Sequence, residues 1–298
     1  MLAGLLPVTG SALLARYWIP TAIVYAPNFG KPAGRLNETH SAQLSVWGIS
    51  QQFQLDVGPP FARLSVWLME PQGPVRGTVV VLHGIRDSKA SMLGMGRLLA
   101  AGGYRPVLVD LRGHGQSSGD WLTYGVLDSQ DLSQVLDALH HRDLLAEPVG
   151  VFGCSYGAAT AIQFAAHDPR VRSVVAVAPF ATLHGAVHSY ARLFGMAFIL
   201  PRATIDRAVE DAGEIGHFLP SEASPLRAIG QTSARVLLIH GEADWKIPLR
   251  SSQQLHAAAP NRSRLIVLKG AGHDSIMRAV RKTSMASILA WFDTPSEN

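Results

Sequence analysis

Hydrophobic and polar positions follow two periods along the chain. Apolar and polar residues alternate over 52–57 and 62–69, which predicts an antiparallel strand pair with one buried face. From residue 77 onward, short continuous apolar runs alternate with stretches of helical spacing, so we expect an α/β fold with a mostly parallel sheet covered on both faces. The expected buried strands are 77–83, 105–110, 149–153, 171–178, 236–240 and 265–268. The expected helices are 91–101, 127–142, 158–166, 249–258 and 276–292.

One long stretch between residues 178 and 234 interrupts this alternation. It contains amphipathic segments over 183–198 and 203–215, and an insertion of this size usually has a function or a structure of its own. We interpret residues 180–229 as a small helical cap over the carboxyl ends of the strands, with a peripheral helix pair as the alternative. The core domain would then comprise residues 43–179 and 230–298.

The first 42 residues are predicted to be an apolar segment followed by a linker. Prolines, a glycine and an arginine interrupt the apolar residues of 1–24, and no uninterrupted run is long enough to span a bilayer. Residues 25–40 are rich in Pro, Gly and Asn and predict an extended linker, with strands from residue 43 onward. We expect a short N-terminal helix on the body of the protein, with a membrane-contacting or trimmed anchor segment as the alternative.

Composition narrows the class of protein. The 298 residues are 47% hydrophobic and 16% charged, which is typical of a globular chain. The net charge is +4, but the basic residues are spread singly, so no nucleic-acid partner is expected. A single cysteine excludes an internal disulfide, which favours the cytoplasm, with membrane association or export through the N-terminal segment as the alternative. Oligomeric state is left open.

The candidate nucleophile lies between a strand and a helix. Residues 149–159 read as an apolar strand, then Gly153-Cys154-Ser155-Tyr156-Gly157, then small helix-forming residues. Glycines on both sides allow a sharp strand-to-helix turn that exposes the serine at the end of the sheet. We therefore predict that Ser155 is catalytic; an ordinary strand–helix turn that contains a serine is the alternative.

A serine nucleophile needs a histidine base and an acid that orients it. Asp244 follows the strand 236–240, and His273 follows the strand 265–268, so both lie at carboxyl ends, where ligands bind in such sheets. Their order after Ser155 is also the expected one. We predict a Ser155–His273–Asp244 triad, with Glu242 as the second candidate for the acid.

Two backbone N–H groups are expected to bind the oxyanion that forms during acyl transfer. One belongs to Tyr156, directly after the serine, and the other to Ile85, in the loop after the strand 77–83. Cys154 is interpreted as a small core side chain. Neither a phosphate-binding glycine loop nor an HExxH motif occurs, so no cofactor and no metal is expected.

These motifs together resemble the serine hydrolases of the α/β-hydrolase superfamily. The resemblance covers about 52–292 and implies an eight-stranded sheet and ester or amide chemistry through an acyl-enzyme. We expect a carboxylesterase for small-molecule esters of small to medium acyl chain, with a peptidase, a thioesterase or lipid deacylase, or an inactive ligand receptor as alternatives. The motifs that carry the resemblance are His83-Gly84, Asp110-Leu111-Arg112-Gly113-His114-Gly115-Gln116-Ser117, Gly153-Cys154-Ser155-Tyr156-Gly157, His240-Gly241-Glu242-Ala243-Asp244 and Gly272-His273.

Overall fold

A single eight-stranded sheet forms the centre of the protein in the computed structural model, which describes residues 18–31 and 41–294. The strand order is β1-β2-β4-β3-β5-β6-β7-β8. β2 is antiparallel to both of its neighbours, and all other neighbours are parallel, which confirms the predicted mostly parallel sheet. The strands are β1 (Gln51–Val57), β2 (Ala62–Leu68), β3 (Thr78–Leu82), β4 (Arg105–Asp110), β5 (Val149–Cys154), β6 (Val171–Val177), β7 (Arg235–Gly241) and β8 (Ser263–Leu268).

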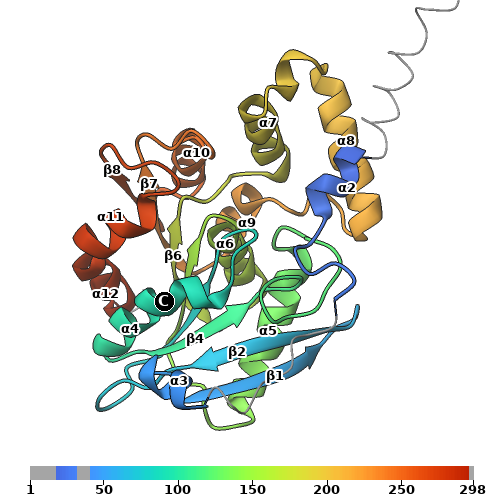
Figure 1. Ribbon diagram of the computed structural model, residues 1–298. Helices are drawn as coiled ribbons and strands as arrows, with labels where there is room; N and C mark the ends of the chain where they lie inside the picture. The colour runs from blue at the N-terminus through green and yellow to red at the C-terminus, as the bar shows by residue number, and fades with distance from the viewer. Residues whose placement is uncertain (1–17, 32–40, 295–298) are drawn as a thin grey trace, which may run out of the picture.

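Helices cover both faces of the sheet (Figure 1). Buried side chains of α5 and α6 pack on one face, and those of α4, α11 and α12 pack on the other. β3 and β5 are buried along their whole length, as continuous apolar runs predict for central strands. The helices are α2 (Ile19–Val24), α3 (Ser41–Val46), η3 (Lys89–Met92), α4 (Leu93–Ala101), α5 (Val126–His140), α6 (Tyr156–His167), α7 (Leu183–Leu193), η4 (Met196–Phe198), α8 (Arg202–Gly216), α9 (Pro225–Gln231), α10 (Arg250–Ala258), α11 (Ile276–Thr283) and α12 (Met285–Asp293).

The predicted insertion between β6 and β7 is helical. It contains α7, η4, α8 and α9, and α7 and α8 project from the body of the protein in Figure 1. Gly216 at the end of α8 lies against Val24 of α2, so the described N-terminal segment packs on the insertion. We refer to residues 183–216 as the inserted helices.

Two local predictions are wrong. Residues 41–46 form the helix α3, whereas strands were expected from residue 43 onward. The single helix expected over 276–292 is two helices, and Ser284, at φ −117° and ψ −1°, is the C-terminal cap of α11 and the N-terminal cap of α12. The Thr283 hydroxyl donates to the Ala279 carbonyl, and such side-chain bonds compete with the helical backbone.

Only part of the N-terminal prediction lies in the described structure. α2 is the short helix present there, and residues 1–17 and 32–40 lie outside the described residues. Within 18–31 and 41–294, no helix combines the length and the apolar character needed to cross a membrane.

Candidate active site

Ser155 sits on a strained turn between β5 and α6. Its backbone has φ 54° and ψ −114°, a conformation that a residue other than glycine rarely adopts. Neighbouring glycines make the turn possible: a Cβ on Gly153 would lie 2.2 Å from the Gly157 carbonyl oxygen, and one on Gly157 would lie 2.5 Å from the His83 carbonyl oxygen. The Gly-x-Ser-x-Gly spacing is therefore required by the close approach of β3, β5 and α6.

The structure brings the three predicted side chains together. Ser155 Oγ lies 3.0 Å from His273 Nε2, and His273 Nδ1 lies 2.7 Å from Asp244 Oδ2. The ionised carboxylate can only accept, so Nδ1 carries the imidazole proton and Nε2 is free to accept the Ser155 hydroxyl proton. This tautomer gives a serine hydroxyl facing an unprotonated base.

Backbone groups hold the Asp244 carboxylate in place. Its Oδ1 accepts the N–H groups of Lys246 at 3.1 Å and Ile247 at 2.9 Å, while its Oδ2 faces His273. Its side chain is fully buried, so these bonds replace the water that it loses. Asp244 is thus fixed in position, and both of its carboxylate oxygens accept hydrogen bonds from N–H donors.

His240 supports the same loop and has no role in the sequence-based prediction. Burial lowers its pKa, so the ring is neutral. Its Nε2–H donates to the Ile247 carbonyl at 2.9 Å, and its Nδ1 accepts from the Ser252 hydroxyl at 2.7 Å. The sequence shows that His240 lies at the end of β7. It does not show that Ser252 and Ile247 are its partners, because these residues reach His240 only when the loop folds.

Glu242, the second candidate for the acid, and the neighbouring Asp274 and Cys154 have other surroundings. Glu242 Oε2 accepts the Gly270 N–H at 3.2 Å, and Asp274 Oδ1 accepts from Lys246 Nζ at 2.6 Å. Cys154 is buried, and burial raises the pKa of its thiol to about 12, so the thiol stays protonated. These contacts favour Asp244 over Glu242 as the partner of His273.

The loop after β3 runs beside the serine. A Cβ on Gly84 would lie 3.7 Å from Ser155 Cβ. His83 Nε2 accepts the Leu111 N–H at 3.1 Å, so its proton is on Nδ1, which donates to the Gly84 carbonyl at 2.7 Å. Because Gly84 C=O and Ile85 N–H belong to one planar peptide unit, this bond also fixes the direction of the Ile85 N–H.

Tyr156 anchors the start of α6. Its hydroxyl donates to Asp128 Oδ2 at 3.0 Å and accepts the Tyr124 N–H at 2.9 Å. Burial raises the pKa of this phenol far above its ordinary value. The side chain therefore points into the core, while the backbone N–H stands in the first turn of α6, where N–H groups have no partner within the helix.

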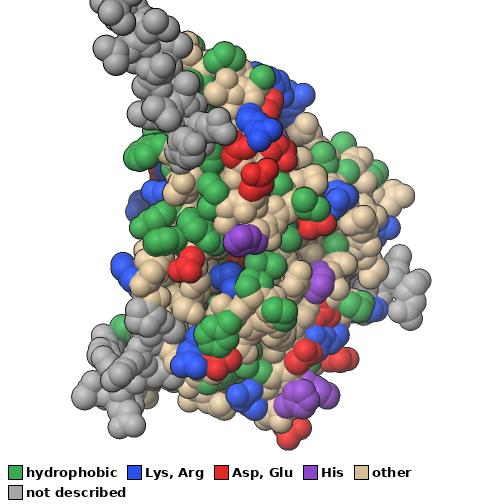
Figure 2. All heavy atoms as spheres, turned by 90° about the vertical axis from the view of Figure 1, so that its right-hand side faces the viewer, with side chains coloured by type: hydrophobic (Ala, Val, Ile, Leu, Met, Phe, Trp, Pro, Cys, Tyr) green, Lys and Arg blue, Asp and Glu red, His purple; other side chains and the backbone are tan. Residues whose placement is uncertain are grey.

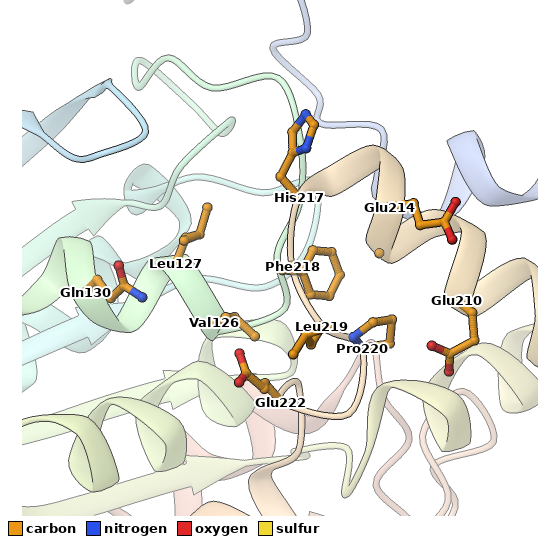
Figure 3. Close-up of a pocket in the computed structure, with 11 residues that line it drawn as sticks. Val126, Leu127, Gln130, Glu210, Glu214, His217, Phe218, Leu219, Pro220 and Glu222 are labelled. Atoms are coloured by element: carbon orange, nitrogen blue, oxygen red, sulfur yellow. The ribbon is translucent and has the colours of Figure 1, made fainter.

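A hollow on the surface of the described chain lies away from these residues. It has a volume of about 510 Å³, and Figure 3 shows Glu210 and Glu214 on α8 on one side of it, with Val126 and Leu127 on the other. None of the triad residues lines it. Acidic side chains also gather on the upper half of the face drawn in Figure 2. Within the described ranges, no group of three or more His, Cys, Asp or Glu side chains is arranged to hold a metal ion.

Two family models match the chain along most of the core. One, described as serine aminopeptidase, S33, matches residues 73–219, and one described as TAP-like protein matches residues 218–298. The chain is 25% identical over 224 residues to the uncharacterised protein YqkD of Bacillus subtilis (strain 168), covering 74% of this chain and 72% of YqkD. It is 28% identical over 216 residues to the uncharacterised protein Rv2307c of Mycobacterium tuberculosis (strain ATCC 25618 / H37Rv), covering 71% and 68%.

Solved structures share the fold. The esterase Pf2001 of Pyrococcus furiosus matches with a TM-score of 0.68 at 20% identity, covering 89% of this chain and 98% of the esterase. An acylaminoacyl peptidase matches with a TM-score of 0.62 at 21% identity, covering 83% of this chain but 42% of the peptidase. At 20% and 21% identity, these matches show a shared fold and nothing more.

Proposed function

We propose that this chain, which belongs to the serine hydrolases of the α/β-hydrolase superfamily, cleaves carboxylic esters of small to medium acyl chain through an acyl-enzyme on Ser155. The observation that carries the proposal is the 3.0 Å contact of Ser155 Oγ with His273 Nε2, together with the 2.7 Å contact of His273 Nδ1 with Asp244 Oδ2. A serine hydroxyl becomes an effective nucleophile when such a base accepts its proton.

Acylation begins with attack of Ser155 Oγ on the ester carbonyl carbon. His273 Nε2 accepts the hydroxyl proton and then donates it to the leaving alcohol as the C–O bond breaks. Asp244 stabilises the imidazolium and keeps the ring in place. Water then gives its proton to His273 and attacks the acyl-enzyme; release of the acid returns the proton to Ser155.

We assign the oxyanion site to the backbone N–H groups of Ile85 and Tyr156. Support comes from the His83 bond that fixes the Gly84–Ile85 peptide and from the anchoring of Tyr156 at the start of α6. Two preorganised donors stabilise the charge that develops on the carbonyl oxygen, and loss of one such donor typically costs about 10²- to 10³-fold in rate.

We further propose that the inserted helices act as a cap that selects the substrate. Tyr190 of α7 supports this role. Burial raises its pKa, and the charges of Lys246, Asp244, Asp274 and Arg86 act on it as well, so its hydroxyl lies among the groups around the serine. A side chain of the inserted helices is therefore within electrostatic reach of the triad residue Asp244, which supports the proposed cap.

A series of 4-nitrophenyl esters of increasing acyl length tests the proposal. We expect turnover to be greatest for short to medium acyl chains. It should fall for longer chains, because the proposed cap limits the room beside Ser155. A pure protein that is labelled by a fluorophosphonate but hydrolyses none of these esters would exclude a general esterase.

Peptidase activity is the second candidate, because the model matching residues 73–219 is described as a serine aminopeptidase. The chain also shares its fold with an acylaminoacyl peptidase, of which it spans 42%. Aminoacyl 4-nitroanilides separate the two candidates: turnover of anilides at rates equal to or above those of the esters would favour the peptidase.

A further inference from the structure

Arg86 occupies an unusual position beside the serine. It follows Ile85 in the loop whose Gly84 borders Ser155, and its side chain is exposed. Its φ of 57° is in the left-handed region, which a residue with a Cβ adopts at a cost. Backbone strain of this kind persists where the surrounding structure requires it, often at binding sites.

The positive charge of Arg86 has no counter-ion in the described chain. The adjacent Asp87 is engaged elsewhere: its Oδ1 accepts the Ser88 N–H at 2.8 Å, and its Oδ2 accepts from the Ser91 hydroxyl at 2.7 Å. Among the residues that the structure describes, no carboxylate forms an ion pair with the Arg86 guanidinium. Its donors are therefore available to a ligand.

The other charged side chains around the serine already have hydrogen-bonding partners. Lys246 Nζ contacts Asp274 at 2.6 Å, and Asp244 is held by His273 and by backbone N–H groups. Arg86 is thus the cation on this side of the site that has no carboxylate partner among the described residues. An uncompensated cation at the mouth of a site attracts and orients anions.

Two tyrosines near the site respond to the charge of the Arg86 guanidinium. Burial raises the pKa of both Tyr124 and Tyr190, and in each case the Arg86 charge acts in the opposite direction. Tyr190 comes from the inserted helices, and Tyr124 from the loop before α5. The Arg86 guanidinium is therefore within electrostatic reach of one tyrosine of the inserted helices and one of the core.

We propose that Arg86 is a specificity residue that binds an anionic oxygen group, a carboxylate or a phosphate, carried by the ester substrate. This inference rests on the proposed esterase function and names its substrate class: esters that bear a second, ionised acid group. A guanidinium suits this task because it offers a fixed fork of N–H donors that matches carboxylate and phosphate oxygens.

Matched esters test the inference. The probes are 4-nitrophenyl hydrogen glutarate and its neutral methyl ester for the acyl side, and phenyl butyrates with a 4-carboxyl, 4-phosphate or neutral 4-substituent for the alcohol side. Arg86→Asn removes the charge but tolerates a positive φ, and Arg86→Lys keeps the charge. Arg264→Asn, an exposed position on β8, is the control for loss of one positive charge.

We expect Arg86→Asn to lower kcat/KM for the anionic ester roughly 10- to 100-fold, chiefly through KM, because a charge-assisted hydrogen bond is lost. The neutral ester should change less than about threefold, Arg86→Lys should recover part of the loss, and Arg264→Asn should behave like the wild type. Whichever anionic probe shows this loss identifies the group and the side of the ester that Arg86 binds.

Equal effects of Arg86→Asn on charged and neutral esters would overturn the inference while leaving the esterase proposal intact. Failure of the wild type to hydrolyse any of the esters would instead overturn the esterase proposal, and the inference with it. Inhibition of the wild type provides a readout without any variant: glutarate or inorganic phosphate should compete with the neutral ester, and glutaramide should not. Equal inhibition by glutarate and glutaramide would also contradict a role for the charge.

Discussion

At the scale of single residues, Asp244 is the residue whose chemistry can be separated most cleanly from its packing. Replacing it with Asn keeps the shape but supplies an N–H toward His273 Nδ1, so the ring proton moves to Nε2 and the base is lost. We expect kcat to fall on the order of 10⁴-fold, with little change in melting temperature. Ester kinetics and thermal unfolding of the purified variant measure both.

Asp274→Asn is the matched control, because this exposed carboxylate pairs with Lys246 and not with the base. An exposed ion pair contributes little, so its kcat should stay within about twofold of the wild type. If Asp274→Asn proved the more damaging of the two changes, the assignment of the acid would be wrong.

Ser155, Asp244 and His273 could be predicted to meet because each follows a strand and their chain order has a known chemical meaning. The supporting role of His240 could not be predicted, because the Ile247 carbonyl and the Ser252 hydroxyl reach His240 only through the folding of the loop after β7. Contacts that depend on loop shape leave no periodic pattern in the sequence.

At the scale of elements, the β5–α6 turn depends on the absence of a side chain at Gly157. Gly157→Ala would place a methyl group 2.5 Å from the His83 carbonyl oxygen, which is backbone and cannot move aside easily. We expect a loss of about 1–3 kcal/mol in the free energy of unfolding, together with reduced activity as β3 and α6 separate. Urea unfolding and ester kinetics report the two effects.

Gly230→Ala provides the comparison, because no atom lies within 4 Å of a Cβ at this exposed position of α9. Alanine there should leave stability unchanged or raise it by up to about 1 kcal/mol through helix propensity. Equal destabilisation by the two substitutions would show that close packing is not the reason for Gly157.

Strands were predicted correctly where burial on both faces of the sheet requires a continuous apolar run, as in β3 and β5. It failed at α3, where local helix formation replaced an expected strand, and at Ser284. The spacing of Ile276, Val280, Ile288 and Phe292 is that of a buried helical face, and all four are buried. This spacing is the same for one long helix and for two helices separated at Ser284, so it could not predict the break.

At the scale of the whole molecule, buried neutral histidines make stability depend on pH. Burial lowers the pKa of His114 to about 4, with the neighbouring His83 charge adding to the effect, and burial lowers the pKa of His83 as well. In the unfolded chain both rings titrate near about 6.5, so below that pH the unfolded chain binds more protons. Stability is therefore fully present above about pH 6.5 and is lost as pH falls toward the folded-state pKa values.

We expect the free energy of unfolding to drop on the order of 1 kcal/mol per pH unit for each histidine between about pH 6.5 and 5. Urea unfolding at several pH values measures this slope. His114→Gln can keep the donation to the Arg112 carbonyl without a titrating group, and should make the slope shallower. A slope that His114→Gln does not change would assign the pH dependence to other groups.

The whole-molecule prediction from sequence was the most secure, because alternating strands and helices leave few ways to connect a mostly parallel sheet. Substrate choice is the least predictable property. It depends on how the inserted helices and the loop at Arg86 enclose the serine, and neither follows from a short motif.

The central claim is that an ester passes through a covalent intermediate on Ser155. The most direct measurement is to quench the wild-type protein during turnover of 4-nitrophenyl butyrate, measure its intact mass, and map the modified peptide. We predict a single butyryl group on the peptide that contains Ser155, and neither adduct nor hydrolysis above background in Ser155→Ala. Ester hydrolysis that persists in Ser155→Ala, or a butyryl group carried by another residue in the wild type, would contradict the claim.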